Sequence, residues 1–357
     1  MSELIKNPTI QDVARHASVS TATVSRALSN PERVSEEMRE KVNAAVEATG
    51  YTLNQAARSL RMRNTKTILV ALPNVSNPFF SPILGAIERE AMEQGYSVLV
   101  ANCTPDDASK QRLRDFLRSN RADGLLLFDG SIPLAHLKDL FQDPNHPPIV
   151  VACEAIADSP FSTVRTNNAE AAAQATQYLI DIGHARIAHV AGPNENILAI
   201  EREAGYRAAM AGARLKVWPD YVVEGGFTID GGVRAARALM SLDAPPTAVF
   251  CASDVTAIGF LSQAQEMGFC CPKDISVVGF DDIELAPHFS PPLTTMHQPT
   301  EDLGRLATEA LLSMLENNAA RRRPTRVVLH SELIIRGSAA PPGRMEKVLG
   351  ASPRATP

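Results

Sequence analysis

The residues from 21 to 26 combine small side chains with one long cation. Thr21, Ala22 and Ser25 are small, and Arg26 adds a guanidinium that can donate two hydrogen bonds to O6 and N7 of guanine. At helical spacing the four side chains share one face, and their small size allows a close approach to base edges. These residues could therefore read DNA. The alternative is the outer face of an ordinary helical hairpin.

The segment from Thr9 to Leu28 has the pattern of two short helices joined by a tight turn. Ser20 stands where the second helix needs an N-cap. Each helix has an apolar stripe, formed by Val13, Ala14 and Ala17 in the first and by Val24, Ala27 and Leu28 in the second. This pattern predicts a helix-turn-helix unit, whose second helix lies in the major groove of DNA. A third helix is expected between Ser35 and Gly50.

Charge is distributed unevenly along the 357 residues. Residues 1–66 hold ten Lys and Arg against seven Asp and Glu (net +3), whereas the remainder holds 25 against 33 (net −8). A basic N-terminal segment suits contact with phosphates. The sequence has no apolar run long enough to span a bilayer, begins without the apolar segment of a signal peptide, and shows no metal-ligand spacing among its five cysteines. We therefore expect a cytoplasmic protein with reduced thiols, no metal and no cofactor.

Beyond residue 66 the pattern changes to apolar strands that alternate with helices. Continuous apolar runs typical of buried parallel strands occupy 68–72, 97–103, 124–128 and 148–153. A second block has strands at 187–192, 248–253 and 276–280, and helices around 168–183, 196–212, 229–241 and 254–267. Two doubly wound α/β units, each binding at the carboxyl ends of its strands, would form a cleft between them.

Several segments, in matching order and spacing, carry a resemblance over nearly the whole chain. They are TIQDVARHASVSTATVSRAL, ARSL, SNPFF, PPTAVFCASD, and VVGFDD followed by PPLTT. They resemble the lactose/galactose repressor (LacI/GalR) family of bacterial transcription regulators. Within the family, STATVSRAL, SNPFFSPI and PPTAVFC are most similar to the cytidine (nucleoside) repressor branch, with the purine repressors next. The resemblance implies a helix-turn-helix domain, a hinge helix and two doubly wound subdomains of the periplasmic-binding-protein type.

The expected domains combine the patterns with the resemblance. A helix-turn-helix DNA-binding domain covers 1–53, a hinge helix and linker 54–66, a ligand-binding and dimerisation domain 67–338, and a disordered tail 339–357. The segment 291–299 is expected to be a strand returning to the first unit, and 332–338 one returning to the second. The first subdomain is assigned 67–165 plus 297–329, and the second 166–296 plus 330–338.

The resemblance implies a set of DNA contacts. Leu60 matches a leucine that family members insert into the minor groove, where an apolar side chain unstacks a base step and kinks the duplex. The alternative for Leu60 is burial against a neighbour in a plain linker helix. Ser18 replaces the Gly of many members and would cost about 1 kcal/mol if the turn needs a positive φ. The expected DNA-contacting residues are Thr9, Ser20, Thr21, Ala22, Thr23, Ser25, Arg26, Asn54, Ala57 and Leu60.

The resemblance also implies an effector site in the cleft. Its aromatic residues could stack on a planar base, while Arg202 and Asp281 could hold sugar hydroxyls. Core packing or an ion pair is the alternative for each residue. The expected effector-binding residues are Phe79, Phe80, Cys153, Asn196, Arg202, Phe227, Asp254 and Asp281.

Three departures from the family pattern narrow the effector. Asn196 and Leu198 replace the Arg and Thr with which purine repressors read their base, and Cys153 replaces a common acidic residue. A nucleoside or pentose therefore fits the retained residues better than a purine base. The alternative is a family regulator that responds to a free sugar or a purine.

The resemblance implies a homodimeric repressor on a pseudo-palindromic operator, in which effector binding shifts the order of the hinge helix. A solute-binding protein is the rival class, because its fold would match residues 67–338. An enzyme is not expected, since the GxGxxG, GxxxxGK[ST] and GxSxG motifs are absent from the sequence.

Overall fold

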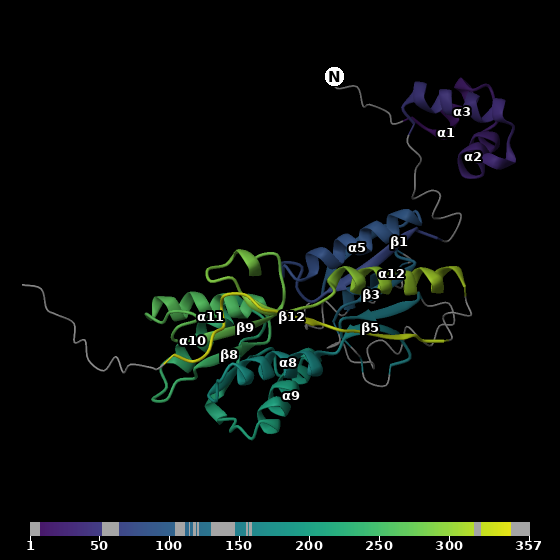
Figure 1. Ribbon diagram of the computed structural model, residues 1–357. Helices are drawn as coiled ribbons and strands as arrows, with labels where there is room; N and C mark the ends of the chain where they lie inside the picture. Colours follow the sequence, from purple (N-terminus) through teal and green to yellow (C-terminus); the bar gives the residue numbers. More distant parts are fainter. Residues whose placement is uncertain are drawn as a thin grey trace, which may run out of the picture. The chain divides into compact units, whose positions relative to one another are not determined.

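The computed structural model in Figure 1 divides the chain into an N-terminal unit, residues 1–65, and a C-terminal unit, residues 66–357. It describes residues 8–51, 64–103, 111–113, 115–116, 119, 121–129, 147–154, 156, 159–317 and 323–343. Asn54, Ala57 and Leu60 of the predicted hinge lie outside the described residues. Among those described, no helix has the length and apolar character needed to cross a membrane.

The N-terminal unit is a small bundle of helices with its own core. Its elements are α1 (Ile10–His16), α2 (Thr21–Ser29), the 3-10 turn η1 (Pro31–Arg33) and α3 (Glu36–Thr49). The hydroxyl of Ser20 accepts a hydrogen bond from the backbone N–H of Thr23 at 3.0 Å, which caps α2 as predicted. The predicted apolar stripes meet in a core of Val13, Ala14, Ala17, Val24, Ala27, Val42 and Ala45.

Ser18, in the turn between α1 and α2, has a φ of 52°, a conformation that glycine adopts with least strain. We expect Ser18→Gly to raise the free energy of unfolding of the N-terminal unit by about 0.5–1 kcal/mol. Hydrogen exchange of the α3 amides in the full chain measures the change. Gly50 provides the matched control, because its φ is 64° and an added Cβ would meet no atom within 4 Å. Gly50→Ala should therefore lower the free energy of unfolding by a similar amount through backbone strain alone. An unchanged exchange rate in Ser18→Gly would contradict the prediction.

The first subdomain of the C-terminal unit is built on a six-stranded parallel sheet in the order β11-β5-β4-β3-β1-β2. Alternate residues of β1 face opposite sides, so Ile68 and Val70 belong to one core and Leu69 to another. Helices α5 (Phe80–Glu93) and α12 (Thr300–Glu316) pack against each other on the side of Ile68 (Figure 1). The strands are β1 (Thr67–Leu72), β2 (Ser97–Asn102), β3 (Gly124–Leu127), β4 (Ile149–Ala152), β5 (Ser162–Thr166) and β11 (Arg326–Leu329).

The second subdomain repeats this plan with the order β12-β10-β9-β8-β6-β7, in which only β12 is antiparallel. Its strands are β6 (Ile187–Ala191), β7 (Val222–Glu224), β8 (Ala248–Cys251), β9 (Ser276–Asp281), β10 (Thr294–His297) and β12 (Glu332–Ile334). One face is covered by α8 (Asn168–Asp181) and α9 (Ile197–Gly212), the other by α10 (Ile229–Met240) and α11 (Asp254–Glu266) (Figure 1). The short turns η2 (Pro219–Tyr221) and η3 (Ala286–His288) complete it.

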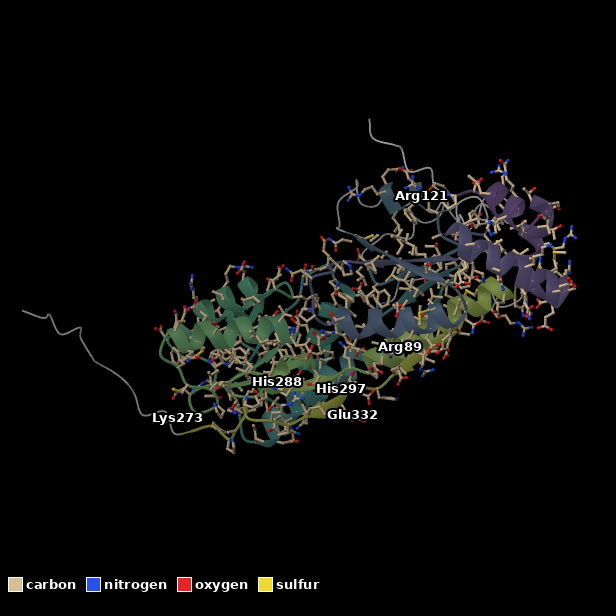
Figure 2. The ribbon with its side chains drawn as sticks, turned by 90° about the horizontal axis from the view of Figure 1, so that it is seen from above. Arg89, Arg121, Lys273, His288, His297 and Glu332 are labelled. Carbon is tan, nitrogen blue, oxygen red and sulfur yellow. The ribbon has the colours of Figure 1, made fainter. Side chains whose placement is uncertain are left out.

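Three crossover segments carry the chain between the two subdomains. They lie between β5 and α8, between β10 and α12, and between β11 and β12. Two of them begin or end at His297 and Glu332, which are partners across β10 and β12 and lie close together in Figure 2. Each subdomain is therefore assembled from parts of the chain that are far apart in sequence.

Two strand predictions were wrong. The run 97–103 is not a buried strand, because β2 is the edge strand of its sheet and Leu99 is 41% exposed. The segment 291–299 does not return to the first unit, because β10 pairs with β9 in the second sheet. Thr294 and Thr295 of β10 are fully buried there, and their polar groups are bonded within the second subdomain.

The predicted start of the disordered tail, at residue 339, also lies too early in the chain. The carbonyl oxygen of Ala340 accepts hydrogen bonds from Nε2 of His184 at 2.9 Å and from Oγ of Ser276 at 3.0 Å. Polar contacts therefore hold the start of the tail against the second subdomain, and no apolar pattern in the sequence predicts them. Residues 344–357 lie outside the described part of the chain.

Candidate functional site

A cavity of about 340 Å³ lies between the two subdomains of the C-terminal unit. Its lining residues follow the carboxyl ends of strands in both sheets, where open α/β sheets bind their ligands. They are Pro73, Asn74, Asn77, Phe79, Phe80, Phe128, Asp129, Cys153, Glu154, Pro193, Glu195, Asn196, Leu198, Arg202, Gly226, Phe227, Thr228, Ser253 and Asp281. We refer to this cavity as the cleft.

The cleft brings together seven of the eight effector residues expected from sequence. They are Phe79, Phe80, Cys153, Asn196, Arg202, Phe227 and Asp281. Asp254 is not among the lining residues. It is fully buried, and its two carboxylate oxygens accept from Oγ1 of Thr295 at 2.6 Å and from the N–H of Ile283 at 2.9 Å. Burial and the nearby charge of Asp281 raise the pKa of Asp254 well above its ordinary value. Asp254 thus fixes the chain that follows β9 rather than facing the cleft.

Aromatic rings from both subdomains line the cleft. In the first subdomain, Phe80 lies edge-on to Phe79, with ring centroids 5.1 Å apart, and to Phe128, with centroids 6.1 Å apart. In the second, Phe227 has a φ of 57° and its ring lies against Gly192, where an added Cβ would come within 2.2 Å of the ring. Only glycine at 192 leaves room for this ring. The rings can therefore stack on a flat ligand or pack against the apolar face of a sugar.

The polar centre of the cleft is a buried pair, Arg202 and Asp281, with 3.6 Å between Nη1 and Oδ1. Arg202 also donates from Nε to Oδ1 of Asn168 at 3.0 Å and from Nη1 to the carbonyl of Ala252, and its guanidinium lies 3.8 Å from the ring centroid of Phe280. Burial raises the pKa of Asp281 to about 6, although Arg202 opposes the rise. Asp281 is therefore ionised at neutral pH and can accept from ligand hydroxyls.

A hydrogen-bond chain connects this centre to the crossover segments. Nε2 of Gln298 donates to Oδ1 of Asp281 at 2.8 Å, and Oε1 of Gln298 accepts from Oγ1 of Thr166 at 2.8 Å. Gln298 follows β10 and Thr166 ends β5, so the two residues stand at two different crossovers. The hydrogen-bond chain therefore joins the polar centre of the cleft to two of the crossover segments.

Carboxylates outnumber cations in the cleft. Asp129, Glu154, Glu195 and Asp281 face one guanidinium, that of Arg202, among the described lining residues. This imbalance disfavours a phosphorylated ligand and favours a neutral ligand with hydrogen-bond donors. Asp129 and Glu154 follow β3 and β4, and sequence reasoning missed both. The rule that ligands bind at strand carboxyl ends, applied to every predicted strand, would have found them.

The exposed face of α2 in the N-terminal unit contains the predicted base-reading residues. Thr21, Ala22 and Arg26 are exposed, whereas Val24 and Ala27 on the opposite side are buried. This arrangement presents one guanidinium and two small side chains to a partner.

The other predicted DNA contacts in this unit take part in caps or lie partly buried. Ser20 and Thr23 form the cap of α2, with 2.8 Å between their hydroxyl oxygens. Thr9 caps α1 in a capping box with Asp12, and Ser25 is partly buried. Ser20, Thr23 and Thr9 therefore have structural roles whether or not they contact a phosphate.

Comparisons with known proteins match both units. Residues 9–54 match the family described as bacterial regulatory proteins, lacI family, and residues 176–339 match a periplasmic binding protein-like domain. The chain is 39% identical over 330 residues to the transcriptional repressor CytR of Escherichia coli, covering 92% of this chain and 96% of CytR. It is 39% identical over 333 residues to the repressor PurR of Vibrio campbellii, covering 92% and 98%.

Solved structures agree. The lac repressor dimer bound to operator and the anti-inducer ONPF is similar with a TM-score of 0.82 and 28% identity, over 94% of this chain and all of that chain. The complex of the transcriptional regulator CelR with cellobiose has a TM-score of 0.70 and 31% identity, over 93% and 100%. The chain therefore belongs to the LacI family of bacterial regulatory proteins.

Proposed function

We propose that this protein is a transcriptional repressor that binds operator DNA through α2 and a small-molecule effector in the cleft. The observation that carries the proposal is the presence of both surfaces in one chain: the exposed Thr21, Ala22 and Arg26 face, and a cleft lined by strand ends of both subdomains. CytR and PurR are named as repressors, which supports the same function here. The protein would act in the cytoplasm, where bacterial operators are.

We propose a nucleoside or a pentose as the effector. The aromatic rings suit a flat base, and Asp281 with Arg202 suits the adjacent hydroxyls of a ribose. Asn196 is already engaged as the N-cap of α9, so its side chain contributes less to base recognition than the sequence suggested. A free sugar is the second candidate, because the similar CelR structure contains cellobiose.

We propose that the protein acts as a homodimer. A second cavity, of about 360 Å³, is lined by both polar and apolar residues, and two of its apolar residues, Ile229 and Leu285, are 54% and 55% exposed. Exposed apolar patches of this kind mark protein interfaces. The similar lac repressor structure is a dimer on its operator, which supports a second copy of the chain as the partner. Two copies would place two α2 helices on a pseudo-palindromic site.

The proposed mechanism couples the cleft to the predicted hinge helix, residues 54–66. An effector held by Asp281 and Arg202 would change the angle between the subdomains through the crossover segments. In the dimer this movement would separate or join the two hinge helices, which we propose to carry Asn54, Ala57 and Leu60 into the minor groove.

Thermal denaturation with a panel of compounds tests the effector class. Cytidine, uridine or adenosine at 100 times its Kd should stabilise the protein by about 2.7 kcal/mol. Cytidine monophosphate should give little shift, because its phosphate would meet the carboxylates of the cleft. Phe227→Ala should reduce the nucleoside shift through loss of stacking. A shift with hypoxanthine or cellobiose and none with nucleosides or with the pentose ribose would contradict the proposed class.

DNA binding separates the proposed function from that of a solute-binding protein. A repressor should bind DNA with an affinity that falls steeply as salt rises, because phosphate contacts release counterions. Absence of salt-sensitive DNA binding by the full chain would favour the solute-binding alternative.

A further inference from the structure

Two residues from opposite subdomains contact each other across the cleft. Glu154 follows β4 of the first subdomain and is 3% exposed, while Asn196 precedes α9 of the second subdomain. Nδ2 of Asn196 donates a hydrogen bond to Oε1 of Glu154 at 3.0 Å. Both residues line the cleft. We call this hydrogen bond the cross-cleft contact.

The orientation of the Asn196 amide is fixed by its own helix. Oδ1 of Asn196 accepts from the N–H groups of Leu198 at 2.9 Å and Ala199 at 3.3 Å, which caps α9. Because Oδ1 is used in this way, Nδ2 is the atom that faces Glu154, and the reverse orientation would oppose two oxygens. On the other side, Cys153 has a φ of 65°, and this strained residue immediately precedes Glu154.

An ion pair among the described residues also joins the two subdomains, but it lies at a different place. Nη1 of Arg165 is 2.7 Å from Oε1 of Glu201, but Arg165 is in β5, one residue before a crossover segment begins. Partners beside a crossover stay close whether the cleft is open or closed. The cross-cleft contact joins residues that no neighbouring crossover holds together, so opening the cleft must break it.

We propose that the cross-cleft contact between Glu154 and Asn196 holds the subdomains closed without effector and thereby sets the effector concentration at which the repressor responds. This regulatory role rests on the proposed function, in which the cleft is the effector site. A protein that is already closed binds a ligand of the closed state more tightly, because less of the binding free energy is used to close it. The carboxylate of Glu154 can also accept further hydrogen bonds from an effector that enters the cleft.

A reciprocal pair of substitutions tests the contact. Asn196→Asp keeps an N-cap as good as asparagine but places a second carboxylate against Glu154, which should open the cleft. In the double variant Glu154→Gln with Asn196→Asp, the glutamine amide can donate to the aspartate, and the contact is restored with donor and acceptor exchanged. Glu154→Gln alone keeps an acceptor for Asn196 and serves as the matched control.

Alkylation of Cys153 measures opening in the full chain without effector. Cys153 lines the cleft and is 4% exposed, whereas Cys251 is fully buried in the second subdomain and reports unfolding. Iodoacetamide should alkylate Cys153 about tenfold faster in Asn196→Asp than in the wild type, as measured by peptide mass spectrometry, because the variant loses a hydrogen bond to a charged group. The double variant should return close to the wild-type rate. Glu154→Gln keeps the contact but removes a charge that raises the pKa of Cys153, so its rate should exceed that of the wild type slightly and stay well below that of Asn196→Asp.

The direction of this change separates opening from a simple charge effect. Burial raises the pKa of the Cys153 thiol, and the charge of Glu154 raises it further. A second carboxylate at 196 would raise it again and slow alkylation, so faster alkylation in Asn196→Asp must come from access. An unchanged or slower rate, a double variant as fast as Asn196→Asp, or equal acceleration at Cys251 would each overturn the proposal.

Cytidine titration of the same variants provides the functional measurement. Asn196→Asp should need several times more cytidine for half-maximal stabilisation than the wild type. If no nucleoside or pentose binds the wild type, the proposed effector class fails, while the alkylation rates still decide whether the contact holds the cleft closed.

Discussion

Arg202→Met is expected to lower the free energy of unfolding by about 3–5 kcal/mol, which is the usual cost of removing one partner of a buried ion pair. Arg202 is 3% exposed and Asp281 5% exposed, so the substitution leaves a buried carboxylate without its cation. It also removes the hydrogen bonds to Asn168 and to the carbonyl of Ala252. Methionine fills much of the vacated volume, which keeps the free-energy cost of an empty cavity small. Effector binding should be lost as well.

The double variant Arg202→Met with Asp281→Asn tests whether the unpaired carboxylate causes the lost stability. Removing the uncompensated charge should recover part of the lost stability, measured by urea denaturation at neutral pH. Asp281 has a pKa of about 6 when folded, above its unfolded value, so the folded state binds this proton more tightly. In the wild type its contribution to stability is therefore lost as pH rises from the unfolded pKa to about 6. Without Arg202 this pKa rises further, so the deficit of Arg202→Met should grow as pH increases above 6. Equal stability of the single and double variants would contradict the ion-pair explanation.

Arg26→Ala should weaken specific operator binding by about 5- to 150-fold for each half-site, since a two-pronged contact to guanine is worth about 1–3 kcal/mol of discrimination. Arg26 is exposed on α2 and lies opposite the core residues Val24 and Ala27, so its removal should leave the fold intact. Fluorescence anisotropy with operator and with unrelated DNA, at the same salt concentration, measures the two affinities. Binding to unrelated DNA should fall much less.

Lys41→Ala provides a control with the same loss of charge. Lys41 is an exposed residue of α3, outside the predicted base-reading face. It should weaken binding to both DNAs slightly and to a similar extent, through the general electrostatic attraction. If Arg26→Ala and Lys41→Ala behave alike, Arg26 contributes charge and no base recognition.

The sequence was most informative where structure depends on neighbouring residues. The stripes of the N-terminal unit and the cap at Ser20 are local, and the structure confirms them. The strand β10 was misplaced because its two buried threonines look polar in sequence. The hydroxyl of Thr295 is bonded to Asp254, 41 residues away, and no local pattern reveals such a partner. The exposed edge strand β2 has the apolar composition of a central strand, so its place in the sheet could not be read from its residues.

The candidate site followed from the sequence only in part. Seven predicted residues meet in the cleft, but Asp254 does not. Its two oxygens accept hydrogen bonds from a threonine hydroxyl of a buried strand and from a backbone N–H. Glu154 was missed because a carboxylate after a strand has no local signature. Its role emerges only with its partner Asn196, which stands 42 residues further along the chain.

The interleaved chain path has a consequence for synthesis on the ribosome. The first subdomain lacks its last strand, β11, until residue 329 has been made, because β11 pairs with β5. It also lacks the cover of α12, which packs on β3, β4 and β5. Most of the second subdomain, from α8 to β10, lies within the single stretch 168–297. The half that is translated first therefore keeps an open sheet edge at β5 until most of the later half has been made, and this edge must remain protected from other nascent chains.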